Sequence, residues 1–357
     1  MIWTRGKFIR NLKKFCRQIE LPLILIGSSA FLFSCKSDKP IPQPTIQTSS
    51  IIGKLNALVI NEGTFQFNNA SLSFIDGANG TIQNDIGSGS GWDVAQSVTL
   101  FNGRLYVVVN NSGKVEILDP QDFHSIASVP NFTSPRYLLP IGNTKAYVTD
   151  LYADAISVLD LNSLAITKKI PCPGWTERLV YHLGKVYVCN YRKTYLYVID
   201  PLSDTKIDSI DIGLGAHHVL VDKYDRLIVS CGGYDLKQTE NQLVFINALT
   251  HQVEKKISFT QDYPSSLAIN STKDSLYYLK THVFKISIEG DQEASTPFVS
   301  GVGKSFYGLD VDPGSNLVFI TDAVDYVQRG KAYIYTASGN PVAQFSTGIV
   351  PNGFCFY

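Results

Sequence analysis

The chain repeats one pair of strand-forming segments about every forty residues. Copies of the first segment are separated by 41, 40, 41, 49 and 41 residues and centre on Tyr106, Tyr147, Tyr187, Ile228, Tyr277 and Val318. A second segment recurs seven times in phase with the first, and most of its copies end on Asp or Asn, as in Tyr197-Val198-Ile199-Asp200. A period near forty with several short strands is typical of a β-propeller, whose sheets bury their faces only against neighbouring sheets. The repeat therefore predicts an all-β fold, a seven-bladed β-propeller with four strands in each blade.

The two ends of the repeat are complementary. Residues 55–60 resemble a second strand with no inner strand before it, and residues 349–357 resemble an inner strand with nothing after it. We expect the N- and C-terminal segments to pair, so that residues 53–357 form one closed ring without a free sheet edge. Blade five carries an insertion at residues 232–241.

The first 34 residues have the features of an export signal. Six basic residues precede an apolar run over residues 21–33, which is too short to span a bilayer as a mature helix. A short transmembrane anchor is the alternative interpretation.

The apolar run is followed by Leu32-Phe33-Ser34-Cys35, which resembles a bacterial lipoprotein box. In such a box the cysteine becomes the lipidated first residue of the mature protein. Lys36 follows Cys35, which in lipoproteins indicates release to the outer membrane. Residues 35–52 would then comprise the lipidated Cys35 and a flexible tether rich in Pro, Gln, Thr and Ser.

Charge and motifs exclude several classes of function. The chain has 31 basic and 31 acidic residues, and loss of residues 1–34 leaves 25 and 30, a net charge of about −5 that argues against a nucleic-acid partner. The other cysteines of the mature chain lie in different blades without a Cys-x-x-Cys pair, so neither a zinc site nor a disulfide framework is expected. No nucleophile elbow or phosphate loop occurs, and we expect no catalytic residue, metal or cofactor.

A ring of unlike polar residues is predicted at one mouth of the channel. These residues open the inner strands of the seven blades and are Gln96, Arg136, Glu177, His217, Ser265, Tyr307 and Asn352. A solvated channel mouth is the simplest explanation, but unlike side chains at symmetry-related positions favour a site for an asymmetric ligand. His217 and His218 cannot chelate one ion, because adjacent strand residues point to opposite faces.

Large aromatic and basic residues accompany the ring. The predicted ligand-binding set adds Tyr137 and Arg178 from the inner strands and, from loops on the same rim, Trp92, Tyr152, Trp175 and Tyr191. Such residues offer stacking and hydrogen-bonding surface for a large organic ligand.

Several segments resemble the YncE-like seven-bladed surface lipoproteins of Bacteroidetes over roughly residues 52–357. The resemblance rests on Asn61-Glu62-Gly63, Asp93-Val94-Ala95-Gln96, Ser134-Pro135-Arg136-Tyr137, Trp175-Thr176-Glu177 and Tyr197-Val198-Ile199-Asp200-Pro201. Within that group the chain is similar to the cobalamin-capturing BtuG type. The resemblance implies an outer-membrane lipoprotein that captures cobalamin, or another large nutrient, and delivers it to a TonB-dependent transporter. The resemblance also implies display at the cell surface, with a domain that faces the periplasm as the alternative.

Two other classes of function stay open at the level of sequence. The first is a propeller enzyme of lyase type, for which His217, Glu177 and Asp150 could hold a metal in the channel. The second is a scaffold for protein interactions.

The lipoprotein hypothesis is testable at Cys35. We expect Cys35→Ser to abolish palmitate labelling and to release the protein from the membrane fraction, because the acyl chains on this residue would be the only anchor. The matched control is Cys16→Ser, in the predicted signal peptide. A Cys35→Ser protein that still incorporates palmitate and stays with the membrane would contradict the hypothesis.

Overall fold

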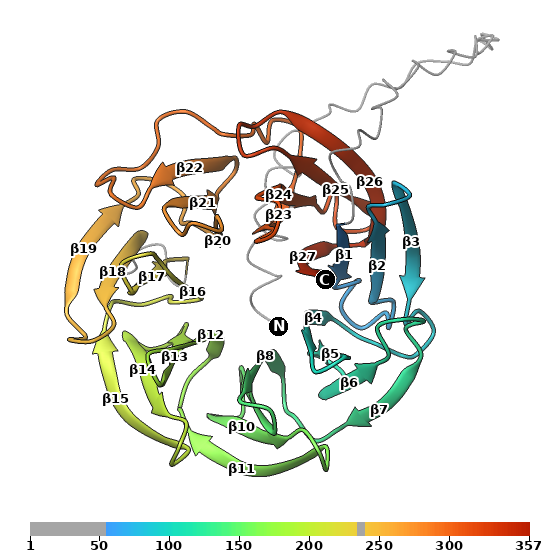
Figure 1. Ribbon diagram of the computed structural model, residues 1–357, viewed down its shortest axis with the longest axis horizontal. Helices are drawn as coiled ribbons and strands as arrows, with labels where there is room; N and C mark the ends of the chain where they lie inside the picture. Colours follow the sequence, from blue (N-terminus) through green and yellow to red (C-terminus); the bar gives the residue numbers. More distant parts are fainter. Residues whose placement is uncertain (1–54, 234–239) are drawn as a thin grey trace, which may run out of the picture. The chain divides into compact units, whose positions relative to one another are not determined.

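The computed structural model describes residues 55–233 and 240–357, which contain 27 strands and no helix. The strands form seven separate antiparallel sheets arranged as a ring (Figure 1). This confirms the predicted all-β fold and the seven blades. In the described residues there is accordingly no helix with the length and apolar character needed to cross a membrane. The predicted signal peptide, Cys35 and the tether lie outside the described residues.

Blade one is built from both ends of the chain, as the sequence predicts. Its strands, from the centre outward, are β27 (Pro351–Phe356), β1 (Asn56–Asn61), β2 (Ser71–Asp76) and β3 (Thr81–Ile86). In the pairing of β27 with β1, Phe354 lies opposite Val59. The backbone N–H of Glu62 also donates to the carbonyl of Val350 at 2.9 Å, which extends the junction beyond the strands.

Blades two to four each contain four strands in chain order from the centre outward. Blade two comprises β4 (Ala95–Phe101), β5 (Arg104–Val109), β6 (Lys114–Leu118) and β7 (Ser125–Val129). Blade three comprises β8 (Pro135–Ile141), β9 (Lys145–Asp150), β10 (Ala155–Asp160) and β11 (Ala165–Pro171). Blade four comprises β12 (Thr176–His182), β13 (Lys185–Asn190), β14 (Tyr195–Asp200) and β15 (Thr205–Asp211).

Blades five to seven complete the ring. Blade five comprises β16 (His218–Val221), β17 (Arg226–Cys231), β18 (Gln242–Asn247) and β19 (Val253–Ser258). Blade six comprises β20 (Ser266–Ile269), β21 (Ser275–Leu279) and β22 (Val283–Ser287). Blade seven comprises β23 (Phe306–Val311), β24 (Val318–Asp322), β25 (Arg329–Tyr335) and β26 (Pro341–Ile349).

Two details differ from the sequence prediction. Blade six has three strands rather than four, because the polar segment after β22 lacks the alternation of a strand. Side-chain contacts hold that segment instead, including the N–H of Ala294, which donates to the Tyr278 hydroxyl at 2.9 Å. In blade seven, Phe319 rather than Val318 takes the central position, since Phe319 lies opposite Ile334 in the third strand.

The hydrophobic core is divided among the seven interfaces between neighbouring blades. Seven clusters of buried apolar residues each join two adjacent blades, and the cluster between blades four and five, for example, contains Tyr187 and Val229. Burial of each such side chain stabilises the fold by roughly 1.5–3 kcal/mol. Within the described residues no blade has a core of its own, so the stability of the ring depends on contacts between neighbours.

The residues that repeat most strictly have structural roles. The hydroxyl of Tyr147 in blade three donates to Asp204 in blade four, and that of Tyr187 in blade four donates to the carbonyl of Ala248 in blade five at 2.8 Å. The repeated Asp closes the next turn, as where Asp160 accepts the backbone N–H of Ser163 at 2.7 Å. The repeated tyrosines therefore connect neighbouring blades by hydrogen bonds, and the repeated aspartates stabilise turns.

Removal of the closing strand should open the ring. We expect deletion of residues 350–357 to abolish the cooperative thermal transition, because β1 loses its inner partner β27 and Phe319 loses its contact with Phe354, whose ring centroid lies 5.1 Å away. The smaller change Phe354→Ala should cost about 3–5 kcal/mol. As a control, Leu202→Ala at a side chain that is 94% exposed should change stability by less than about 0.5 kcal/mol. A truncated protein with the wild-type melting curve would refute closure by this strand.

Candidate ligand-binding site

A repeated β-bulge positions most of the predicted ring residues. In four inner strands the register with the neighbouring strand shifts after the first residue, between Ala95 and Ser97, Pro135 and Leu138, Thr176 and Leu179, and Phe306 and Leu309. The residues within these shifts include Gln96, Arg136, Glu177 and Tyr307, and Asn352 is passed over in the same way between β27 and β1. A bulge re-aims side chains that strict alternation would send into a blade. Most of the predicted ring thus rests on one backbone feature.

Arg136 ties three blades together at this level. Its Nε donates to Oε2 of Glu177 in blade four at 2.9 Å, and its Nη1 donates to Oε1 of Gln96 in blade two. The Asn352 side chain donates to the backbone carbonyl of Gln96 at 3.2 Å, which continues the network into blade one. Gln96, Arg136 and Glu177 are all buried. The ring therefore satisfies much of its own hydrogen-bonding capacity.

Burial and charge act in opposite directions on the Arg136–Glu177 pair. Burial raises the pKa of Glu177, and the neighbouring Arg136 opposes that rise. For Arg136 burial acts to lower the pKa, but the Glu177 carboxylate, together with Tyr137 and Glu62, raises it overall. Arg136 is therefore held as a cation, and loss of either partner would leave a buried charge without compensation.

His217 is engaged by backbone carbonyls on both sides of its ring. Nδ1 lies 2.8 Å from the carbonyl oxygen of Gly215, and Nε2 lies 2.9 Å from that of Pro264. Burial lowers the pKa of His217, although both carbonyl contacts oppose this effect. Neither nitrogen is placed to bind a metal or to exchange a proton with a substrate.

The other groups of the lyase hypothesis are also committed to structural contacts. Asp150 accepts the backbone N–H groups of Thr133 and Ser134 with one carboxylate oxygen, and those of Tyr152 and Ala153 with the other. Among the described residues, the single cluster with metal-ligand spacing is Asp119, Asp122 and His124, in a turn at the outer edge of blade two. It lies away from the ring.

An aromatic row runs along the predicted rim from blade three to blade six. It consists of Tyr152, Trp175, Tyr191, His217 and Tyr263, whose successive ring centroids are 5.6, 6.0, 6.3 and 5.3 Å apart. The Arg192 guanidinium lies 3.7 Å from the centroid of the Trp175 ring. Trp175 and Tyr191 are buried within the row, whereas Tyr152 is 44% exposed at its end.

The predicted residues differ in accessibility. Tyr137, Arg178, Tyr307 and Asn352 are partly exposed. Trp92, in contrast, is 1% exposed and packs in the cluster between blades one and two. Gly87 has a φ of +74°, and a Cβ there would lie 2.5 Å from the Trp92 ring, so the glycine-rich loop serves to cover this tryptophan. We therefore leave Trp92 out of the ligand surface.

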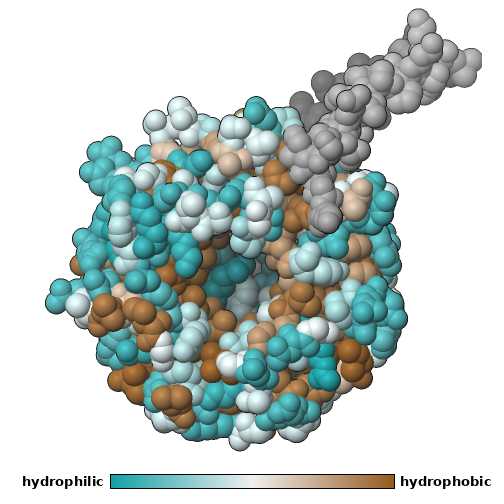
Figure 2. Space-filling model, viewed as in Figure 1, coloured by the Kyte–Doolittle hydropathy of each residue, from teal (hydrophilic) through white to brown (hydrophobic). Residues whose placement is uncertain are grey.

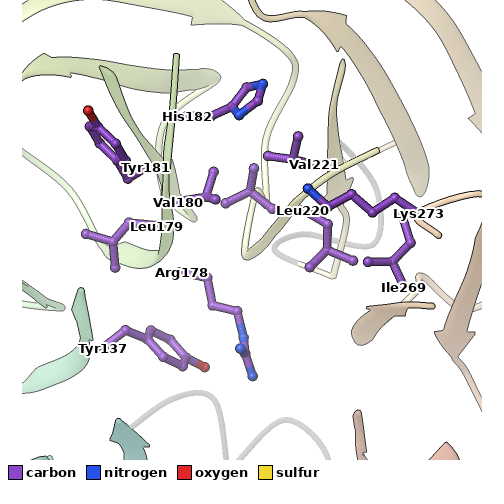
Figure 3. A pocket seen from close by; sticks show the side chains of 11 residues that line it. Tyr137, Arg178, Leu179, Val180, Tyr181, His182, Leu220, Val221, Ile269 and Lys273 are labelled. Carbon is purple, nitrogen blue, oxygen red and sulfur yellow. The ribbon is translucent and has the colours of Figure 1, made fainter. Parts of the chain in front are cut away.

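The sequence did not predict a cavity of about 410 Å³ on the inner sides of blades three to six. Its lining combines Tyr137 and Arg178 of the predicted set with apolar and basic residues that were not predicted, namely Leu179, Val180, Tyr181, His182, Val219, Leu220, Val221, Ile269 and Lys273 (Figure 3). Figure 2 shows the central hollow of the ring, with hydrophilic residues inside it and hydrophobic residues around it.

Asp310 is a further site residue that sequence analysis missed. It lies in β23, and its Oδ2 accepts the backbone N–H of Phe354 at 3.0 Å. Burial raises the pKa of Asp310 to about 6, while Arg178 and the Phe354 N–H act to lower it. Asp310 occupies an otherwise apolar part of an inner strand. Its carboxylate interacts electrostatically with Arg178, which belongs to another blade.

Comparisons with known proteins support the fold. A family model described as a domain of unknown function (DUF5074) matches residues 56–347. No curated protein matches the chain. The chain is similar in structure to a quinonprotein alcohol dehydrogenase-like protein from Bacteroides thetaiotaomicron, with a TM-score of 0.65 and 17% identity, over 85% of this chain and 78% of that one. Hydrazine synthase from Kuenenia stuttgartiensis matches with a TM-score of 0.63 and 14% identity, over 72% of this chain and 88% of that one. A functionally unknown protein from Desulfotomaculum acetoxidans matches with a TM-score of 0.64 and 13% identity, over 84% of this chain and 98% of that one. At these identities the likeness concerns the fold alone.

Asp310 should make stability depend on pH. Its folded-state pKa of about 6 lies above the value of about 3.9 in an unfolded chain, so its contribution to stability is complete below pH 4 and is lost as the pH rises through 6. We expect Asp310→Asn to be more stable than the wild type at pH 8, by on the order of 1 kcal/mol, and to lose that advantage near pH 4. Urea unfolding at both pH values measures the difference. The control is Asp291→Asn at an exposed site, and an Asp310→Asn effect that is equal at both pH values would contradict the assignment.

Proposed function

We propose that this chain, which belongs to the family described as a domain of unknown function (DUF5074), captures a large organic ligand on the rim that carries the aromatic row. Cobalamin is the first candidate ligand. On this proposal the protein is an outer-membrane lipoprotein, anchored through Cys35, that passes its ligand to a TonB-dependent transporter. The cobalamin, anchor and transporter rest on the resemblance to YncE-like lipoproteins of the BtuG type.

The aromatic row is the observation that carries the proposal. Rings packed edge to face and stacked over four blades form a rigid row, most of it buried, and Tyr152 presents an exposed ring at one end. Arg192, which is exposed and stacks on Trp175, adds a planar cation with several N–H donors beside that ring. Rigid aromatic residues flanked by arginine are the usual anchors of binding surfaces.

The chemistry of a corrinoid suits such a surface. A corrinoid has a broad apolar ring system edged with amide groups, so its site needs flat aromatic contacts and varied hydrogen-bonding partners. Tyr152, the exposed ring at the end of the row, supplies the first and is held in place by edge-to-face packing on the buried Trp175. Tyr307 and Asn352, which are partly exposed members of the ring, supply the second from other blades. The buried Arg136 network acts as a rigid floor beneath them.

The proposal favours a binding protein over an enzyme. Both nitrogens of His217 face backbone carbonyls, Glu177 pairs with Arg136, and Asp150 holds four backbone N–H groups. No observation in the described residues favours a lyase reaction at these side chains.

Calorimetry with cobalamin tests the proposal directly. The wild-type protein should bind cobalamin, and Tyr152→Ala combined with Arg192→Ala should weaken binding at least about thirtyfold, because loss of a binding anchor costs about 2 kcal/mol or more. Both side chains are exposed, so the variant should keep the wild-type melting curve. The control is Tyr224→Ala, at an exposed tyrosine in the turn between β16 and β17. Absence of cobalamin binding by the wild type would remove this ligand, and unchanged affinity in the double variant would exclude this surface.

A further inference from the structure

The cavity lies toward the opposite end of the inner strands from the aromatic row. Trp175 directly precedes β12, whereas Tyr181 and His182, which line the cavity, are the last two residues of β12. A strand rises about 3.3 Å per residue, so the two ends of this strand are separated by roughly 20 Å. Lys273, in the turn between β20 and β21, also belongs to the cavity end. The cavity is therefore distinct from the rim of the proposed function.

Apolar side chains form a large part of the cavity walls. Side chains from three neighbouring inner strands contribute to them, among them Leu179, Val180, Val219, Leu220, Val221 and Ile269. A volume of about 410 Å³ falls within the range of small-molecule sites. Such walls favour a ligand with a hydrocarbon or aromatic body.

Two cations lie at different depths in this apolar cavity. Arg178 extends from β12 toward Tyr137, and its guanidinium carbon lies 4.8 Å from the centroid of the Tyr137 ring (Figure 3). Its Nε is buried and has no hydrogen-bond partner among the described residues. A buried guanidinium N–H without an acceptor is costly, and an anionic oxygen would remove that cost.

Lys273 is exposed, and its side chain points toward the part of the cavity that Leu220 and Val221 line (Figure 3). No acidic residue is among the described residues that line the cavity. At this end of the channel the Asp225 carboxylate pairs with a lining residue, since its Oδ1 lies 3.2 Å from Nε2 of His182. Deeper in the channel, the charge of Arg178 acts to lower the pKa of Asp310 and of Glu177, although neither carboxylate accepts a hydrogen bond from it.

We propose that this cavity binds an organic anion with an apolar body, such as a carboxylate on a hydrocarbon or aromatic frame. The anionic group accepts hydrogen bonds from Arg178 and from the Tyr137 hydroxyl, which itself accepts a hydrogen bond from Gln96 at 3.5 Å. The apolar body lies along the walls from β12 and β16, and Lys273 covers the exposed end. This site goes beyond the proposed function, because its apolar walls and Lys273 extend from Arg178 toward the end of the channel that lies away from the aromatic row.

A fluorescent anion tests the site in the full-length protein. Anilinonaphthalene sulfonate should bind with enhanced fluorescence and should be displaced by naphthoate. Naphthalenemethanol, which has the same apolar frame without the charge, should displace it at least about tenfold less well, because a hydrogen bond to a charged group contributes about 1.5–3 kcal/mol. Equal displacement by the two compounds would overturn the proposal.

Two variants test whether Arg178 and Lys273 are responsible for the preference for the anion. Arg178→Met should weaken naphthoate binding at least about tenfold, and Lys273→Glu should weaken it severalfold. Lys273 lies on an exposed turn, so its variant keeps the test valid if Arg178→Met fails to fold. The control Lys169→Glu makes the same charge change on the exposed outer strand β11. Wild-type affinity in Lys273→Glu, or an equal loss in Lys169→Glu, would overturn the assignment.

The rim variant separates this proposal from the proposed function. Tyr152→Ala combined with Arg192→Ala should leave naphthoate binding unchanged, and Lys273→Glu should leave cobalamin binding unchanged. Loss of naphthoate binding in the rim variant would mean that the dye reports the rim rather than the cavity.

Discussion

The pairing of β27 with β1 is the constraint on which the rest of the structure depends. Every hydrophobic cluster joins two neighbouring blades, so an open ring would expose the apolar faces of both terminal blades to water. The pairing brings together residues nearly 300 positions apart, such as Val59 and Phe354. Closing so long a loop costs chain entropy that is recovered only when the two flanking clusters form. Closure and core formation are therefore one cooperative event.

Closure also determines the chemistry of the channel. The inner strand of each blade has an unpaired edge, and the repeated bulge places polar side chains beside it. Arg136 spans three blades and compensates the buried Glu177. A network of this kind makes the ring rigid because every member loses a partner if a blade shifts. The same rigidity holds the aromatic row, whose residues come from four different blades, in fixed positions.

The strict repeat made the fold predictable from sequence, because Tyr147 and Asp160 have the same structural role in their blades as their counterparts elsewhere. The ring was predictable for the opposite reason, since Gln96 and Glu177 break the repeat at equivalent positions. The burial of Trp92 was not predictable, because sequence periodicity cannot distinguish a loop residue that packs into a core from one that faces a ligand. The absence of a fourth strand in blade six was not predictable either. The segment there is held by individual contacts, such as the hydrogen bond from the Ala294 N–H to the Tyr278 hydroxyl, which leave no periodic pattern in the sequence. The cavity was also beyond sequence analysis, since its lining combines residues from different blades, such as Arg178 and Lys273.

Arg178 links the two halves of the channel. It follows Glu177 of the ring in sequence, lies over Tyr137, lines the cavity and lowers the pKa of Asp310 across the channel. An anion bound in the cavity would compete with Asp310 for this guanidinium and would shift the Asp310 proton equilibrium toward the neutral acid. Asp310 in turn accepts the N–H of Phe354, which lies in the closing strand. If an anion binds in the cavity as proposed, its binding would therefore be coupled, through the Asp310 carboxylate, to β27, the strand that closes the ring.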